Sequence, residues 1–118
     1  AKKNLSKAVK AGVKIAFGTD SSVYPHGMNG HEFGALVELG MSPLGAIQAA
    51  TIHAAKLLGW DTQIGQLQPG FYADLVAVPS NPLANVRVLE NIPFVMKGGE
   101  VFKDERSPAC GPQSTPKP

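Results

Sequence analysis

The sequence predicts an α/β protein whose architecture is incomplete within its 118 residues. A helical pattern over residues 5–11 runs almost directly into a short apolar stretch, residues 13–17, bounded by glycines. Short helix-to-strand connections of this kind are typical of α/β units. After residue 60 the hydrophobic pattern changes to several brief strand-like runs. The single strand expected over residues 13–17 cannot form a sheet by itself, so further chain or a partner must complete the core.

The first two elements follow from the spacing of apolar residues. Apolar side chains recur at helical spacing from Leu5, and Gly12 is placed to end that helix near Ala11. Residues 13–17 are then expected to form a buried strand.

Two further helices are predicted after a loop. Asn29, three residues before a glutamate, resembles the start of a capping box, and the helix that follows is expected to end at Gly40. Ser42 as N-cap and Pro43 at the first helical position begin another helix, whose apolar face continues to Leu58.

The second half of the chain is predicted to consist of short strands. Residues 73–78 form the clearest of them, and Asp74 at its head is best interpreted as a structural turn acceptor. Residues 86–89 and 93–96 are further strand candidates. Lys97–Glu100 carries a Gly-Gly hairpin signal that leads into the last strand.

The residues that could carry chemistry come after the first strand. Asp20 stands where that strand meets a loop, and in parallel α/β folds such loops build the functional site. His26 follows on the same loop, and a carboxylate with an imidazole can bind metal or move protons. The local pattern alone favours a structural turn, in which Asp20 accepts backbone hydrogen bonds and His26 lies on the surface.

Composition excludes several classes of function. The formal net charge of +2 is too small to indicate a nucleic-acid partner, and no aromatic residues interleave with the lysines near the N-terminus. No apolar run approaches the ~20 residues that span a bilayer, so no membrane partner is expected. The chain starts without the apolar region of a signal peptide, which leaves the compartment open with a lean to the cytoplasm. Cys110 is the only cysteine, which excludes an intrachain disulfide.

Three stretches, taken in order, resemble the C-terminal part of an amidohydrolase-superfamily enzyme. The first, Gly18-Thr19-Asp20, is similar to the end of the last barrel strand in that superfamily. The second, residues 42–59, resembles the helix after the barrel, with His53 where relatives commonly carry Asn. The third, residues 65–101, resembles the return of the chain into a small β-sandwich.

The resemblance implies an α/β fold that is the C-terminal part of a (β/α)8 TIM barrel followed by part of a small β-sandwich domain. Residues 1–60 would supply the last strand and helices of the barrel, and residues 61–103 the C-terminal part of the composite sandwich. The polar, proline-rich residues 104–118 are expected to be a disordered tail. The remainder of the barrel would then lie outside this chain.

Tyr24-Pro25-His26-Gly27 looks most like the branch of Xaa-Pro dipeptidases, aminoacyl-arginine or -lysine carboxypeptidases and imidazolonepropionase-like enzymes. Such enzymes use one or two divalent metals, usually zinc, to activate water against an amide-type C–N bond of a small-molecule or dipeptide substrate. The resemblance gives Asp20 the roles of metal ligand and catalytic base with proton shuttle, and gives His26 a contact with substrate. In this context a site role for Asp20 is favoured over a turn role.

The sequence lacks most of what that chemistry needs. Its histidines are His26, His31 and His53, with no His-x-His pair, whereas a catalytic zinc uses about three protein ligands. His53 is predicted to be a partly buried, hydrogen-bonded helix histidine. Most metal ligands would therefore lie outside this chain, and the isolated segment is expected to be inactive. The alternatives are a deaminase of the same superfamily and a non-enzymatic module that self-associates as a homo-oligomer.

Overall fold

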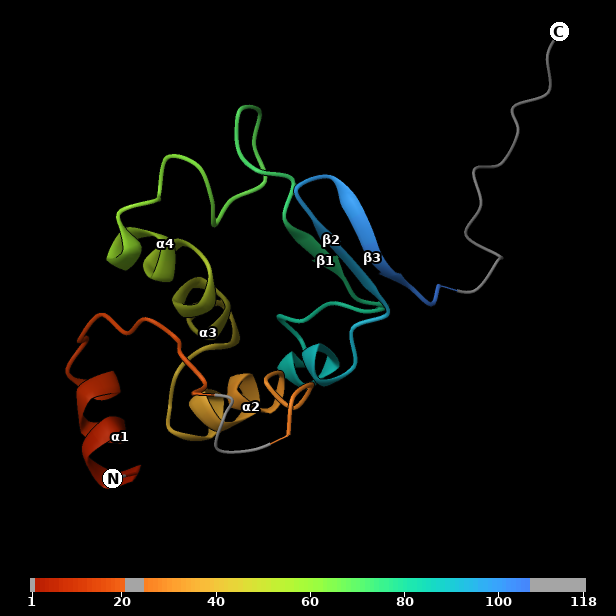
Figure 1. Cartoon of the computed structure of the whole chain (residues 1–118). Coiled ribbons are helices and arrows are strands. Elements are labelled where there is room, and N and C mark those ends of the chain that lie inside the picture. The colour runs from red at the N-terminus through yellow and green to blue at the C-terminus, as the bar shows by residue number, and fades with distance from the viewer. Residues whose placement is uncertain (1, 21–24, 107–118) are drawn as a thin grey trace, which may run out of the picture.

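The computed structural model describes residues 2–20 and 25–106 of the chain. Four helices gather on one side and a three-stranded sheet lies on the other (Figure 1), which confirms the predicted α/β class at this level. Tyr24 and the tail from residue 107 lie outside the described residues. In chain order the elements are α1 (Lys2–Lys10), α2 (His31–Glu38), α3 (Pro43–Ala50), α4 (Ile52–Leu58), β1 (Leu75–Ala77), the 3₁₀ helix η1 (Val86–Glu90), β2 (Phe94–Lys97) and β3 (Glu100–Asp104).

The predicted end signals at Ser42 and Gly59 are confirmed, but the long third helix is divided. The Ser42 hydroxyl accepts a hydrogen bond from the Gly45 N–H at 3.0 Å, which confirms Ser42 as an N-cap. At Thr51 the backbone leaves the helical region, with φ −119° and ψ −93°, and separates α3 from α4. The Thr51 hydroxyl donates to the Ile47 carbonyl at 2.8 Å, a back-bond that is typical of helix bends. A left-handed Gly59, φ +72°, ends α4.

The expected strand over residues 13–17 is not formed, and this prediction was wrong at the level of hydrogen bonding. The segment is extended but has no ladder partner among the described residues. It is fixed to the helices instead: the Phe17 N–H donates to the Ala49 carbonyl at 2.9 Å. The Phe17 ring also stacks on Phe33 of α2, with centroids 4.8 Å apart. A strand needs a neighbouring strand, and the described part of the chain offers none at this place.

The sheet is antiparallel throughout, in the order β1-β2-β3. Gly98 and Gly99 have φ values of +58° and +83°, as a two-residue hairpin turn requires, and they join β2 to β3 as predicted. The Gly98 N–H donates to the Asp74 carboxylate at 2.7 Å. Asp74 is therefore the structural turn acceptor that the sequence indicated.

Residues 86–89 form part of a 3₁₀ helix and not the predicted strand. The Asn85 side chain caps η1 by accepting from the Arg87 N–H at 3.1 Å, which favours a helical turn at this point. Because side chains three apart lie on one face of a 3₁₀ helix, Val86 and Leu89 are buried together. The 3₁₀ helix η1 packs beside α2 (Figure 1).

The core is thin. Seven hydrophobic residues are buried in the described part of the chain, and three of them are alanines. Leu57, Leu58 and Trp60 at the end of α4 are more than half exposed. Within residues 2–20 and 25–106 no helix is long and apolar enough to cross a membrane.

Candidate functional site

Asp20 ends the extended segment in an uncommon backbone conformation. Its φ of +47° is the only positive value at a non-glycine residue in the described parts of the chain. Asp tolerates the left-handed region better than most residues, but at a cost in free energy. The side chain is exposed, and its carboxylate has no hydrogen-bond or ion-pair partner among the described residues. The structure thus presents a carboxylate that is open to a ligand or a proton.

His26 lies in an exposed turn between Asp20 and α2. The two ends of this stretch are tied together, because the Asn29 amide donates to the Thr19 hydroxyl at 3.1 Å. The capping role predicted for Asn29 was wrong: Gly30 is the N-cap of α2, and no side chain caps it. The Asn29 side chain reaches back to the residue before Asp20 instead.

His31 was not singled out by the sequence, yet it joins the site loop to η1. Its Nδ1 atom lies 3.3 Å from Oε2 of Glu90. The two residues are far apart in the chain, and no local pattern connects them. Only the packing of η1 on α2 brings them together.

The described residues do not make a metal site by themselves. No group of three or more His, Cys, Asp or Glu side chains that could hold a metal occurs within residues 2–20 and 25–106. A closed zinc site needs about four ligands. Asp20, His26 and His31 are therefore not such a set, and a metal bound by Asp20 would need ligands from outside the described residues to complete its site.

His53 is half-buried in α4, as predicted, but the predicted hydrogen bond of its side chain has no partner among the described residues. It lines a hollow of about 390 Å³ between α4 and the extended segment, beside Lys14 and Lys56. The hollow has no acidic side chain in its lining. Nothing in this arrangement makes His53 a ligand.

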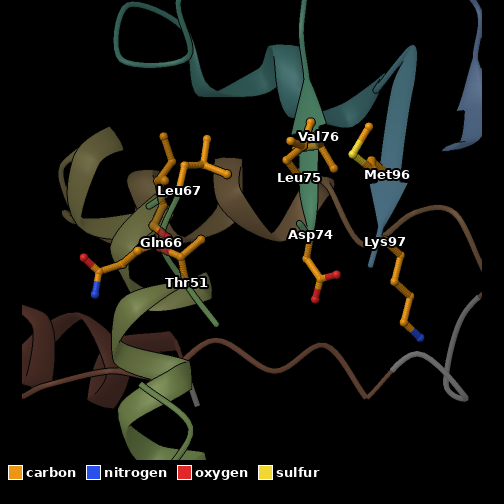
Figure 2. A pocket seen from close by; sticks show the side chains of 9 residues that line it. Thr51, Gln66, Leu67, Asp74, Leu75, Val76, Met96 and Lys97 are labelled. Carbon is orange, nitrogen blue, oxygen red and sulfur yellow. Dashed lines mark hydrogen bonds between the residues drawn. The ribbon is translucent and has the colours of Figure 1, made fainter. Parts of the chain in front are cut away.

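A second hollow, of about 560 Å³, lies between the α3–α4 junction and the sheet (Figure 2). Leu67, Leu75, Val76 and Met96 give it an apolar lining. Its acidic group is Asp74, which is already bonded to the β2–β3 hairpin. This hollow is a packing surface and brings no further reactive group to Asp20.

Residues 2–102 match the model of the amidohydrolase family, and the chain belongs to that family. It is 42% identical over 110 residues to the ochratoxinase of Aspergillus niger, covering 89% of this chain and 22% of that protein. It is also 32% identical over 84 residues to a 5-methylthioadenosine/S-adenosylhomocysteine deaminase of Thermoanaerobacter pseudethanolicus, covering 63% of this chain and 20% of the deaminase.

Solved structures agree with this assignment. The chain superposes on a Xaa-Pro dipeptidase with bound methionine with a TM-score of 0.83 and 45% identity, covering 86% of this chain and 25% of that one. For the A. niger ochratoxinase the TM-score is 0.75 at 40% identity, covering 87% and 24%. The chain therefore spans about a quarter of the length of these relatives.

Proposed function

We propose that the full-length protein hydrolyses an amide-type C–N bond and that Asp20 is its catalytic base and proton shuttle. The observation that supports this most is the open carboxylate at the end of an extended segment, inside the region that matches the amidohydrolase family. The likeness to a Xaa-Pro dipeptidase favours a dipeptide or a similar small amide as the substrate.

Each group of this chain has a defined part in the proposed reaction. Asp20 accepts the proton of the attacking water and returns it to the leaving nitrogen. His26, exposed on the following turn, contacts the substrate. Asp20 would also contribute one ligand to a divalent metal, for which the proposal favours zinc, and the other ligands would come from outside this segment. When bound, such a metal makes its water more acidic and polarises the substrate carbonyl.

The fold supports a place for the segment at the end of a (β/α)8 barrel. In this proposal residues 13–17 are the last barrel strand, which gains its ladder from strands outside the chain. Asp20 then lies at the carboxyl end of that strand, where barrel enzymes carry their active sites. Residues 61–103 belong to the sandwich domain.

A deaminase is the second candidate, because adenine deaminases and a methylthioadenosine deaminase are also among the relatives. Their identities to this chain, 30–36% for the adenine deaminases and 32% for the methylthioadenosine deaminase, are lower than the 42% of the ochratoxinase and the 45% of the dipeptidase. The two candidates differ in product. A peptidase-type hydrolase releases an amino acid, whereas a deaminase releases ammonia.

The test is Asp20→Asn in the zinc-loaded full-length protein, assayed for amino-acid release from dipeptides and for ammonia release from adenine nucleosides. We expect dipeptide hydrolysis in the wild type and a fall in kcat of about 100- to 10,000-fold in the variant, since the amide cannot accept a proton. Asp61→Asn, an identical change in the turn after α4, is the control and should keep its activity. Near-normal turnover by Asp20→Asn would remove this residue from the mechanism, and ammonia release alone would favour the deaminase.

A further inference from the structure

The start of α2 is pressed against the backbone of η1. A Cβ atom placed on Gly30 would lie 2.2 Å from the Leu89 carbonyl oxygen and 2.9 Å from the Glu90 Cα atom. Neither neighbour is a flexible side chain, so only glycine fits here. A Cβ on Gly34, one turn further along α2, would meet the Arg87 guanidinium at 3.2 Å. Two glycines thus allow η1 to lie directly on α2.

A charge network fastens this contact. Arg87 bridges two carboxylates, with Nη2 at 2.6 Å from Glu38 and Nη1 at 2.8 Å from Glu90. The second oxygen of Glu90 lies 3.3 Å from Nδ1 of His31. His31 and Glu38 are the first and last residues of α2, so the network spans the whole helix. Five residues make up this contact, which we call the η1 clamp: Gly30, His31, Glu38, Arg87 and Glu90.

The clamp is a network of charged groups and not an isolated ion pair, and of its charged side chains only Glu90 is less than half exposed. The Glu90 side chain is 22% exposed, and it contacts both the Arg87 guanidinium and the His31 imidazole. Isolated exposed pairs contribute little, whereas networks with good geometry contribute more. The buried side chains of Val86 and Leu89 lie under the same 3₁₀ turn and fix its position.

The clamp continues into the candidate site through Asn29. This residue precedes Gly30 and donates to the Thr19 hydroxyl at 3.1 Å, next to Asp20. Two backbone hydrogen bonds join Met28 and Asn29 to the start of α2, from the His31 N–H to the Met28 carbonyl at 3.1 Å and from the Glu32 N–H to the Asn29 carbonyl at 3.2 Å. A series of contacts therefore leads from η1 through α2 and Asn29 to Thr19, the residue directly before Asp20.

We propose that Arg87 and Glu90 are positioning residues for the candidate active site. Through the η1 clamp they hold segment 25–31, and through Asn29 they fix the backbone at Thr19 and Asp20. This inference rests on the proposed function of Asp20. It gives the second half of the chain, which carries no catalytic group of its own in the proposed reaction, a direct part in that reaction.

The first test does not depend on activity. Hydrogen–deuterium exchange is followed in the full-length protein and in Glu90→Gln and Arg87→Gln, with Glu105→Gln as the matched control. Glu105 pairs with Lys103 at 3.1 Å, away from α2. We expect peptides covering residues 25–34 to exchange several-fold faster in the two clamp variants, while β2–β3 peptides and the control stay unchanged. Equal exchange in all the proteins overturns the proposal.

The second test measures the effect on the reaction. In Glu90→Gln we expect kcat to fall about 10- to 100-fold with KM within about twofold, because small misplacements of a catalytic group are costly. Asn29→Ala should lower kcat similarly, and the double variant should be little worse than either single one, since both break one chain of contacts. Faster exchange with unchanged kcat, or fully multiplicative losses, overturns the positioning role.

The two hypotheses can fail separately. If the wild type hydrolyses no amide and releases no ammonia, the proposed function is wrong, and the clamp is judged by the exchange data. If the wild type is active and Asp20→Asn is not, while the clamp variants behave like Glu105→Gln in both tests, the function stands and the positioning role is wrong.

Discussion

At Asp20 the backbone geometry and the side-chain chemistry both support the catalytic role that we propose for this residue. A φ of +47° costs a non-glycine residue free energy, and such strain is kept where the surroundings over-determine it. Here the neighbouring Thr19 hydroxyl is held by Asn29 at 3.1 Å. The strained residue also has an open carboxylate, which is why its replacement by Asn is the first test of the proposed function.

A second acidic residue, Asp104, has a pKa that a neighbouring arginine lowers. The pKa of Asp104 is lowered from its ordinary 3.8 to about 2, mainly by hydrogen bonds from the Arg106 side chain at 2.7 and 2.6 Å. Because the folded-state pKa is lowered, this pair stabilises the fold above about pH 4, and its contribution is lost as pH falls toward 2. The pair is exposed, so the effect on stability is small.

We therefore predict that Arg106→Gln returns the pKa of Asp104 toward 3.8. An NMR titration of the Asp104 carboxyl carbon measures it directly, with Lys103→Gln as a nearby change of charge that should leave the midpoint low. A midpoint that stays near 2 in Arg106→Gln would show that another group stabilises the carboxylate.

Residue-level prediction from sequence succeeded where the determinant is local. Ser42 was recognised because a cap is defined by neighbouring positions. Asp74 was recognised as a turn acceptor from its residue type, but its partner Gly98 is 24 positions away and could not be identified from the local sequence. His31 and Glu90 were missed because their contact depends on how η1 packs. The Asn29 side chain bonds to Thr19, ten positions earlier, and does not cap α2 as the local pattern predicted.

Among the elements, prediction was best for helices with clear end signals. It was worst for segments that form a strand only if a neighbouring strand pairs with them. The first helix, the α3 start, β2 and the Gly98–Gly99 hairpin were foreseen. Residues 13–17 and 86–89 have strand-like composition, but the first has no partner strand within the described residues and the second is turned by its Asn85 cap. Strand formation depends on neighbours that the local sequence does not contain.

The packing of the first half of α4 against the following loop can be tested with two matched glycines. Gly65 and Gly70 share a φ of +88°, but a Cβ on Gly65 would lie 2.9 Å from the Ala55 Cβ and 3.0 Å from the Thr51 carbonyl oxygen, whereas a Cβ on Gly70 meets nothing within 4 Å. Both alanine variants incur the left-handed penalty, and only Gly65→Ala adds overpacking.

We predict that Gly70→Ala lowers the free energy of unfolding by about 1 kcal/mol and Gly65→Ala by about 2–4 kcal/mol. Denaturant unfolding of the two variants measures the difference. Equal losses would show that α4 and the loop can separate without cost at this point.

For the whole molecule, the main property is how much apolar surface the described segment leaves open. Leu57 and Leu58 are 76% and 66% exposed, and only small or medium side chains fill most of the core. Exposed apolar patches of this kind mark surfaces that other chain or a partner covers. The segment spans about a quarter of the length of its relatives, which agrees with a surface that further chain covers.

We predict that the isolated 118-residue segment self-associates and hydrolyses no dipeptide. Sedimentation velocity measures the association, which Leu57→Lys should reduce because it charges the most exposed part of the α4 face. Lys56→Gln, a neighbouring polar change, is the control. A segment that stays monomeric or turns over substrate contradicts this prediction, and an active oligomer would favour a site shared between subunits.

During synthesis of the protein, the η1 clamp can form only some time after α2 has been made. Arg87 and Glu38 are 49 positions apart, so the ribosome finishes α2 well before it has added the residue that fastens it. At about 5–20 residues per second this interval is roughly 2–10 seconds. During it the nascent chain carries α2 without its contact to η1. Synonymous codons that slow translation between these positions would lengthen that exposure.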